Sequence, residues 1–257
     1  MRRPPPGRKN LFMNASRQTA AYSIGWDVGG WNCDRNARSR DAVVILNGNL
    51  GVVGKPWRGN LRETINTAIK SSDWVPQLFD LCGSKLSDTN FEATLAIDTP
   101  LGFSTEFQNL ITSREPQLSV GSSDTNEYLY RKTERLLFER QKRPLSAIKD
   151  MIGSQATKGI HVLAKFAPHS LSCGVWSDRL IITAIEAYPA CCKKSALINN
   201  FLNKINLSAV HRDIHDAAIC AIIAHIFRSR PDQLWPPSAE IPNNEGWIWL
   251  PNDAFAP

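Results

Sequence analysis

The chain has 257 residues, of which 42% are hydrophobic and 21% charged, and its formal net charge is +6. This is the composition of a folded globular protein, so disorder over the whole length is excluded. No run approaches the roughly 18 to 20 apolar residues that cross a bilayer, and residues 1–10 lack the apolar stretch of a secretory signal. We therefore expect a cytoplasmic protein with no membrane partner.

The positive charge is concentrated at the start of the chain. Five basic residues and no acid lie there: Arg2, Arg3, Arg8, Lys9 and Arg17. We predict a flexible basic tail over residues 1–20 and one folded domain over residues 21–257. The six cysteines form no CxxC pair, which indicates reduced, mostly buried side chains and neither a disulfide framework nor a zinc site.

The domain begins with signals for strands. Apolar, β-branched segments at residues 21–26 and 41–46 predict two strands, and the turn signal at 47–49 predicts an antiparallel meander. Apolar residues at helical spacing from Leu61, with Asn60 as a cap, predict a helix after it.

The rest of the chain alternates between strands and helices. Buried strands are predicted at 91–97 and 179–187, a long helix at 209–230 and an edge strand at 245–251. Residues 105–180 are mixed, with a helical pattern within 122–141 and no clean period elsewhere. The alternation predicts a single layered α/β domain.

Acidic residues follow the predicted buried strands. Asp27, Asp98 and Glu186 each close a strongly apolar run, where an unpaired charge is costly, and Asp216 lies in the first part of the long helix. Carboxylates that converge from separate elements are the ligands that Mg²⁺ or Mn²⁺ prefers. Two such ions about 3.5 to 4 Å apart can activate water and stabilise the leaving oxygen in phosphodiester cleavage. The alternative for any single acid is a turn or helix cap, which is the favoured role for Asp213.

Five segments in this order resemble the domain of unknown function 429 family, whose members are predicted nucleases of RNase H-like fold. The segments are IGWDVGGW, LAIDTPLGF, IEAYPA, DIHDAAICAIIAH and EGWIWLP. The resemblance implies an RNase H-like mixed sheet, an antiparallel meander followed by parallel strands, flanked by helices. It also implies that Asp27, Asp98, Glu186 and Asp216 are catalytic and ligate Mg²⁺ or Mn²⁺ in a nuclease that acts on nucleic acid.

Basic residues inside the domain are candidates for contacts to substrate. The segment YRKTER resembles the Arg-x-x-acid segment of the family through Arg131 and Glu134. Arg131, Arg135 and Arg143 are therefore predicted to contact backbone phosphates, with a solvated helix face as the alternative. His211 and His215 have the i, i+4 spacing of a transition-metal pair, but no third ligand or HExxH glutamate accompanies them.

Two other functions use the same residues differently. Actin-like and sugar-kinase-like phosphotransfer proteins hold nucleotide phosphates with an acid and a glycine-rich hairpin, which GWDVGG resembles, although no second hairpin follows. A non-catalytic module that binds nucleic acid or protein through the basic segments would not require the four acids to meet. The type of nucleic acid and the oligomeric state are left open by the sequence.

Overall fold

The computed structural model describes residues 19–205, 207 and 211–255. Its strands form a single eight-stranded mixed sheet. The strands are β1 (Ala20–Asp27), β2 (Asp41–Asn47), β3 (Trp57–Gly59), β4 (Phe91–Asp98), β5 (His169–Ser172), β6 (Val175–Ser177), β7 (Ile182–Ala187) and β8 (Ile248–Trp249).

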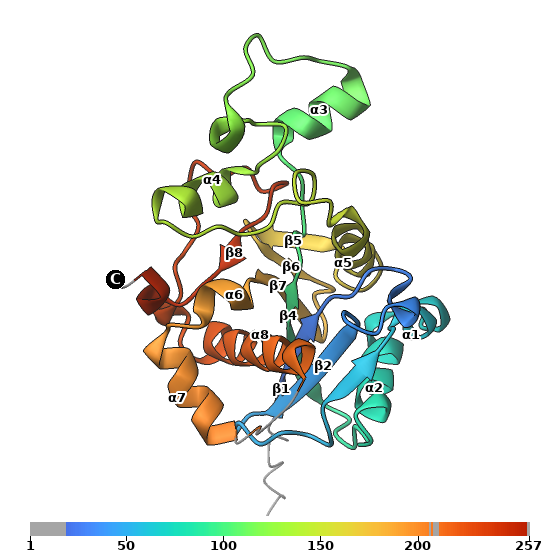
Figure 1. Cartoon of the computed structure of the whole chain (residues 1–257). Coiled ribbons are helices and arrows are strands. Elements are labelled where there is room, and N and C mark those ends of the chain that lie inside the picture. Colours follow the sequence, from blue (N-terminus) through green and yellow to red (C-terminus); the bar gives the residue numbers. More distant parts are fainter. Residues whose placement is uncertain (1–18, 206, 208–210, 256–257) are drawn as a thin grey trace, which may run out of the picture.

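The sheet has the order β3-β2-β1-β4-β7-β6-β5, and β8 pairs with β7 (Figure 1). The first three strands are an antiparallel meander, whereas β4 and β7 run parallel to β1. The structure therefore confirms the predicted mixed α/β sheet, in which a meander precedes parallel strands. The predicted edge strand at 245–251 is shorter than expected, because only two of its residues pair with β7.

The helices of the described residues cover both faces of this sheet. They are α1 (Arg62–Thr67), α2 (Ser71–Leu81), α3 (Thr105–Ser113), α4 (Lys132–Glu139), α5 (Gly153–Phe166), α6 (Pro189–Cys192), α7 (Ala196–Ile205) and α8 (Arg212–Ser229). The helix predicted from Leu61 is divided into α1 and α2, because the backbone of Ala68 is extended and α2 begins anew where the Asp73 side chain accepts the N–H of Lys70 at 3.2 Å.

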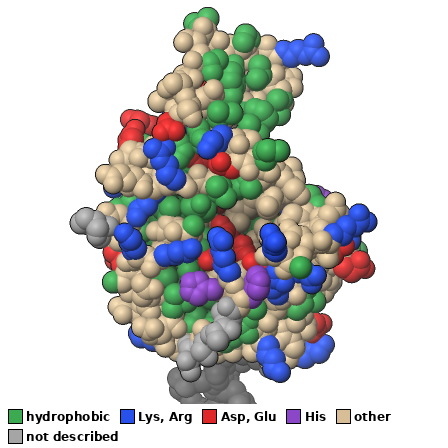
Figure 2. Space-filling model, in the orientation of Figure 1, with side chains coloured by type: hydrophobic (Ala, Val, Ile, Leu, Met, Phe, Trp, Pro, Cys, Tyr) green, Lys and Arg blue, Asp and Glu red, His purple; other side chains and the backbone are tan. Residues whose placement is uncertain are grey.

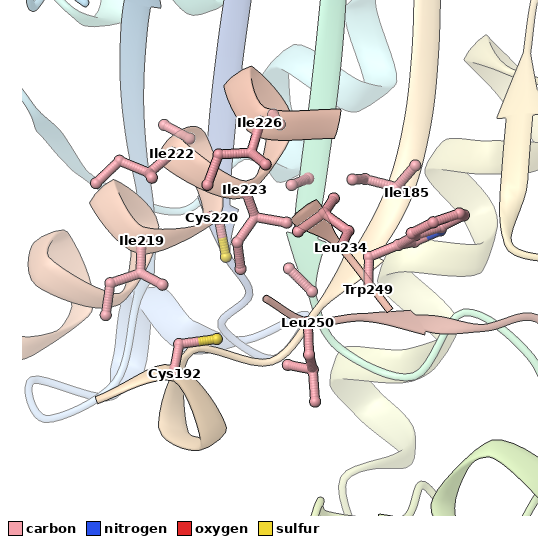
Figure 3. Close-up of a cluster of buried hydrophobic side chains, with 14 of the residues drawn as sticks. Ile185, Cys192, Ile219, Cys220, Ile222, Ile223, Ile226, Leu234, Trp249 and Leu250 are labelled. Atoms are coloured by element: carbon pink, nitrogen blue, oxygen red, sulfur yellow. The ribbon is translucent and has the colours of Figure 1, made fainter. Parts of the chain in front are cut away.

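Side-chain alternation along the strands separates two hydrophobic cores. In β2, Val43 and Ile45 pack on the side of α1, α2 and α5, whereas Val44 and Leu46 pack on the side of α8. Figure 3 shows the second core, where Ile219, Cys220 and Ile223 of α8 lie against strand and C-terminal residues. Both faces of the sheet are thus buried, which explains why its central strands are almost continuously apolar.

Helix α8 crosses β1 at unusually close range. A Cβ atom on Gly25 of β1 would lie 1.9 Å from the carbonyl oxygen of Ala217 and 2.3 Å from the backbone nitrogen of Ala221. Glycine on the strand and alanines on the helix are therefore what allow the contact. As a result, the first turns of α8 lie beside the carboxyl ends of β1 and β4.

Other segments lie away from this arrangement. Residues 103–128, which contain α3, project from the body at the top of Figure 1. The basic tail predicted for residues 1–20 lies outside the described residues up to residue 18, and Ala20 already belongs to β1. No helix in the described part of the chain is long and apolar enough to span a membrane.

Candidate functional site

The carboxyl ends of the two central parallel strands place two acids side by side. Asp27 of β1 is in direct register with Asp98 of β4. The neighbours two residues earlier, Gly25 and Ala96, face α8, so alternation places both carboxylates on the α8 side of the sheet. Neither carboxylate accepts a hydrogen bond from the residues that the structure describes.

Helix α8 adds a third acid to the pair. Asp216 is buried in the second turn of the helix, and its Oδ1 atom has no hydrogen-bond partner among the described residues. The Nε atom of Arg212 lies 3.4 Å from its other oxygen. Asp213 is engaged elsewhere, because it pairs with Arg58 at 2.8 Å and accepts the N–H of Arg40 at 3.0 Å.

Asp27, Asp98 and Asp216 line one cavity of about 470 Å³. Figure 2 shows it as a hollow in the middle of the face, with acidic side chains at its floor and basic side chains and histidines around its mouth. The three acids that the sequence places far apart are therefore brought to one cavity. A cleft outside the carboxyl ends of parallel strands is also the usual place for a ligand site in an α/β sheet.

The clustered charges change the acidity of the two strand-end acids. Burial, together with the negative charges of Asp98, Asp213 and Asp216, raises the pKa of Asp27 to about 9. Burial and the carboxylates of Asp216 and Glu186 also raise the pKa of Asp98 well above its usual value, and Arg212 opposes this. The cavity floor thus favours a bound cation or protons over bare negative charge.

Glu186 lies at the same sheet edge but has a different environment. It is in register with Ile97 and not with Asp98, so its side chain leaves the sheet on the opposite face. Both of its oxygens accept hydrogen bonds from Arg131, at 2.6 and 2.8 Å, and one also accepts the N–H of Leu101 at 2.9 Å. Glu186 lines the cavity, but its charge is compensated by the arginine.

Arg131 is placed differently from the prediction. Its side chain is 3% exposed and pairs with Glu134 at 2.9 Å as well as with Glu186. It also donates to the carbonyl oxygen of Glu245 at 3.0 Å. The predicted phosphate contact does not agree with this placement, because the guanidinium is enclosed by protein acceptors. The arginine and the acid of the Arg-x-x-acid segment, Arg131 and Glu134, thus form a buried structural ion pair.

The other two predicted phosphate contacts do not line the cavity. Arg135 pairs with Glu127 at 3.1 Å, and Arg143 pairs with Asp124 at 2.6 Å and lies over the ring of Phe138. Both pairs involve side chains of α4 or the segments flanking it. Each of these two arginines is therefore paired with a nearby acid and is not part of the cavity lining.

A buried ion pair fixes the loop that follows Asp27. Asp41, fully buried at the start of β2, pairs with the equally buried Lys158 of α5. Asp41 also accepts the N–H groups of Gly29 at 2.8 Å and Leu61 at 2.6 Å. Gly29 allows this close approach, because a Cβ atom there would lie 2.7 Å from the backbone nitrogen of Asp41. Gly29 thus allows the loop after Asp27 to lie against the start of β2, where Asp41 holds it.

Sequence reasoning missed the basic side chains at the mouth of the cavity. Arg38 and Arg212 line it together with His211, which caps α8 by accepting the N–H of Asp213. Arg38 is one of three arginines within residues 35–40, between β1 and β2. This local positive charge is the only sequence signal for a role of Arg38. Lys158 gave no signal, because it stands on the apolar face of an amphipathic helix.

The cavity fits a divalent cation to a limited extent. No group of three or more His, Cys, Asp or Glu side chains in the described ranges is arranged to hold an ion. Mg²⁺, however, usually keeps several waters and uses one or two carboxylates plus phosphate oxygens of a substrate. Asp27 and Asp98 meet that need. The Oδ1 atom of Asp216, which has no hydrogen-bond partner among the described residues and lies 3.7 Å from the Nδ1 atom of His215, is a further acceptor.

Comparisons with protein-family models, with curated proteins and with solved structures found no match for this chain. The resemblance noted in the sequence therefore stands on its motifs, and a function must be argued from the geometry of the cavity.

Proposed function

We propose that this protein is a metal-dependent nuclease of RNase H-like fold that hydrolyses phosphodiester bonds of nucleic acid. The observation that carries the proposal is the in-register pair Asp27 and Asp98, joined by Asp216 in one cavity at the carboxyl ends of β1 and β4. The strand order supports the fold assignment, because a β1–β3 meander is followed by β4 and β7 parallel to β1.

Asp27 and Asp98 offer the carboxylate oxygens that Mg²⁺ or Mn²⁺ prefers, and Asp216 adds a further acceptor in the same cavity. Bound there, the ion would supply Lewis-acid stabilisation of phosphate oxygens and a water of lowered pKa. Asp27 and Asp98 would hold it from two rigid strands, and Asp216 would approach from α8. Glu186 acts as a positioning residue, since its bonds to Arg131 and to the Leu101 N–H fix the chain that follows Asp98.

Metal binding can be tested without an activity assay. Mn²⁺ binding is measured by electron paramagnetic resonance for the native protein, Asp27→Asn, Asp98→Asn and the control Asp80→Asn. Asp80 is an acid outside the cavity that pairs with Lys85. We expect the two cavity variants to lose at least tenfold in affinity and the control to bind like the native protein.

Cleavage is then measured over single- and double-stranded DNA, RNA and hybrid, with Mg²⁺ or Mn²⁺ added. Metal-dependent cleavage that falls at least a hundredfold in Asp27→Asn and Asp98→Asn, but not in Asp80→Asn, is expected. Unchanged turnover in Asp27→Asn would contradict the proposal, and so would the absence of cleavage of every substrate in the panel.

A further inference from the structure

The walls of the cavity differ in chemical character. Arg38, His211 and Arg212 stand on the side formed by the β1–β2 loop and the start of α8. Pro144, Leu145 and Ile152 line the side formed by the segment before α5. The carboxylates lie between these walls, so a ligand in the cavity would meet cations on one side and apolar surface on the other (Figure 2).

The two arginines of the cationic wall retain hydrogen-bond donors. The Arg38 side chain is exposed and donates no hydrogen bond within the described part of the chain. The Arg212 side chain is 77% exposed, and its contact to Asp216 is long, at 3.4 Å. Arg58, by contrast, is held by Asp213 and by the carbonyl oxygen of Ala37. Arg38 and Arg212 are therefore the guanidinium groups available to a phosphate.

The apolar wall exposes a large side chain at the mouth. Leu145 is 46% exposed although it stands beside a cluster of charges. The ring of Tyr188 also lines the cavity, and its hydroxyl donates to the carbonyl oxygen of Arg143 at 3.4 Å. Enzymes that act on an unpaired nucleotide hold its base between aromatic or apolar side chains in the same way.

The size of the cavity limits what can reach the acids. A volume of about 470 Å³ is that of a small-molecule site and accommodates one nucleotide. A cavity of this volume encloses about one nucleotide and does not enclose a length of double helix. Figure 2 shows acidic side chains at the floor of the hollow, so a nucleotide has to enter the cavity to reach them.

We propose that the substrate is single-stranded nucleic acid, of which one unpaired nucleotide enters the cavity; this inference rests on the proposed nuclease function. Arg38 and Arg212 bind its phosphate. Leu145, Ile152 and the ring of Tyr188 contact its base and sugar. A blunt duplex is then a poor substrate, whereas a duplex with a single-stranded overhang is cleaved in the overhang.

The test measures binding apart from cleavage. Fluorescence anisotropy in Ca²⁺ compares a labelled single-stranded oligonucleotide with a blunt duplex of the same sequence. Arg38→Ala and Leu145→Ser are matched by Arg35→Ala, which changes an exposed arginine of the same loop outside the cavity, and by Leu118→Ser, which changes an exposed leucine of the projecting segment.

We expect the single strand to bind at least tenfold more tightly than the duplex. Leu145→Ser and Arg38→Ala should each weaken this binding by about 5- to 50-fold, because each removes one contact to the base or the phosphate, and the controls should not. Equal binding of duplex and strand, or equal effects in the cavity variants and their controls, would overturn the inference.

The same proteins are then assayed for cleavage in Mg²⁺ or Mn²⁺. Cleavage of blunt duplex at the rate of the single strand overturns the inference but leaves the nuclease function intact. Binding of single strands that depends on Arg38 and Leu145, without cleavage of any substrate, supports the inference and refutes the nuclease function.

Discussion

Gly25 sets the distance between the central strand and the helix that carries Asp216. Its missing side chain leaves room for the backbone of Ala217 and Ala221, so α8 lies directly on β1. Any side chain at this position would push the start of α8 away from Asp27 and Asp98. The glycine is thus a requirement of the cavity as well as of the packing.

Gly25→Ala tests this contact. Because the new methyl group would overlap backbone atoms and not a flexible side chain, we expect a loss of about 3 kcal/mol or more in the free energy of unfolding. Gly48→Ala is the control, since the nearest atom to a Cβ atom there lies 3.7 Å away. The free energy of unfolding of both variants is measured in urea. Equal values for Gly25→Ala and Gly48→Ala would contradict the close packing of α8.

Asp178 is a second residue whose local hydrogen bonds have a testable effect on stability. Its Oδ1 atom accepts the N–H groups of Leu180, Ile181 and Ile182 at 2.8 to 3.0 Å, and its Oδ2 atom accepts the hydroxyl of Ser71. Burial acts to raise its pKa, but these hydrogen bonds outweigh burial and lower it. The charged form therefore stabilises the turn between β6 and β7 and ties α2 to it.

For Asp178→Asn we expect a loss of about 1 kcal/mol at pH 7, where the native carboxylate is charged. A lowered pKa in the folded state gives stability that is present above the unfolded value, near 3.9, and is lost as the pH falls through the folded value. The difference between the two proteins should therefore narrow below pH 4. Urea unfolding from pH 7 to pH 3 measures it, and a gap that widens with acid would be inconsistent with this account.

At the scale of elements, buried charges join segments that the sheet alone does not connect. Arg131 links α4 to β7 through Glu186 and to the segment before β8 through the carbonyl of Glu245. The Glu245 carboxylate in turn accepts the N–H groups of Thr105 and Lys132. The chain between Asp98 and α4 is therefore held at several points by one network beside the cavity.

Arg131→Met tests whether this buried network contributes more to the free energy of unfolding than an exposed ion pair does. It leaves Glu134 and Glu186 buried without their partner, so we expect a loss of about 3–5 kcal/mol in the free energy of unfolding. Arg135→Met removes a more exposed pair with Glu127 and should cost below about 1 kcal/mol. Chemical unfolding compares the two, and similar losses would argue against a structural role for Arg131.

The sequence predicted part of the cavity for identifiable reasons. Asp27 and Asp98 were found because each ends a strongly apolar run, and the ends of neighbouring parallel strands meet at one edge. Glu186 obeys the same rule, but its register to Ile97 decides which face it occupies, and register is a property of the whole sheet. Arg38 and Arg212 became candidates only when the fold placed the β1–β2 loop beside α8.

At the scale of the molecule, the mixed sheet was predictable and the segment 105–180 was not. Apolar periodicity reports burial, and the central strands and α8 are buried on nearly all sides. Helix α3 buries none of its residues, and β5 is exposed along its whole length. Where little is buried, hydrophobic patterning contains little information on structure. Helix α5 is buried on one face, but Lys158 and Gly159 are among its buried residues and interrupt the apolar pattern.

The same contrast predicts how stability is distributed over the molecule. Ile111, Leu118 and Val120 of the projecting segment are at least half exposed, whereas twelve residues of α8 are buried. Opening α3 exposes little apolar surface, so its amides should exchange with deuterium orders of magnitude faster than those of α8, which open only with the sheet. Hydrogen–deuterium exchange followed by mass spectrometry compares peptides covering Thr105–Ser113 and Arg212–Ser229. Equally slow exchange in both would show that the apolar side chains of the projecting segment are covered in solution, and repeating the measurement at several protein concentrations would reveal whether a second copy covers them.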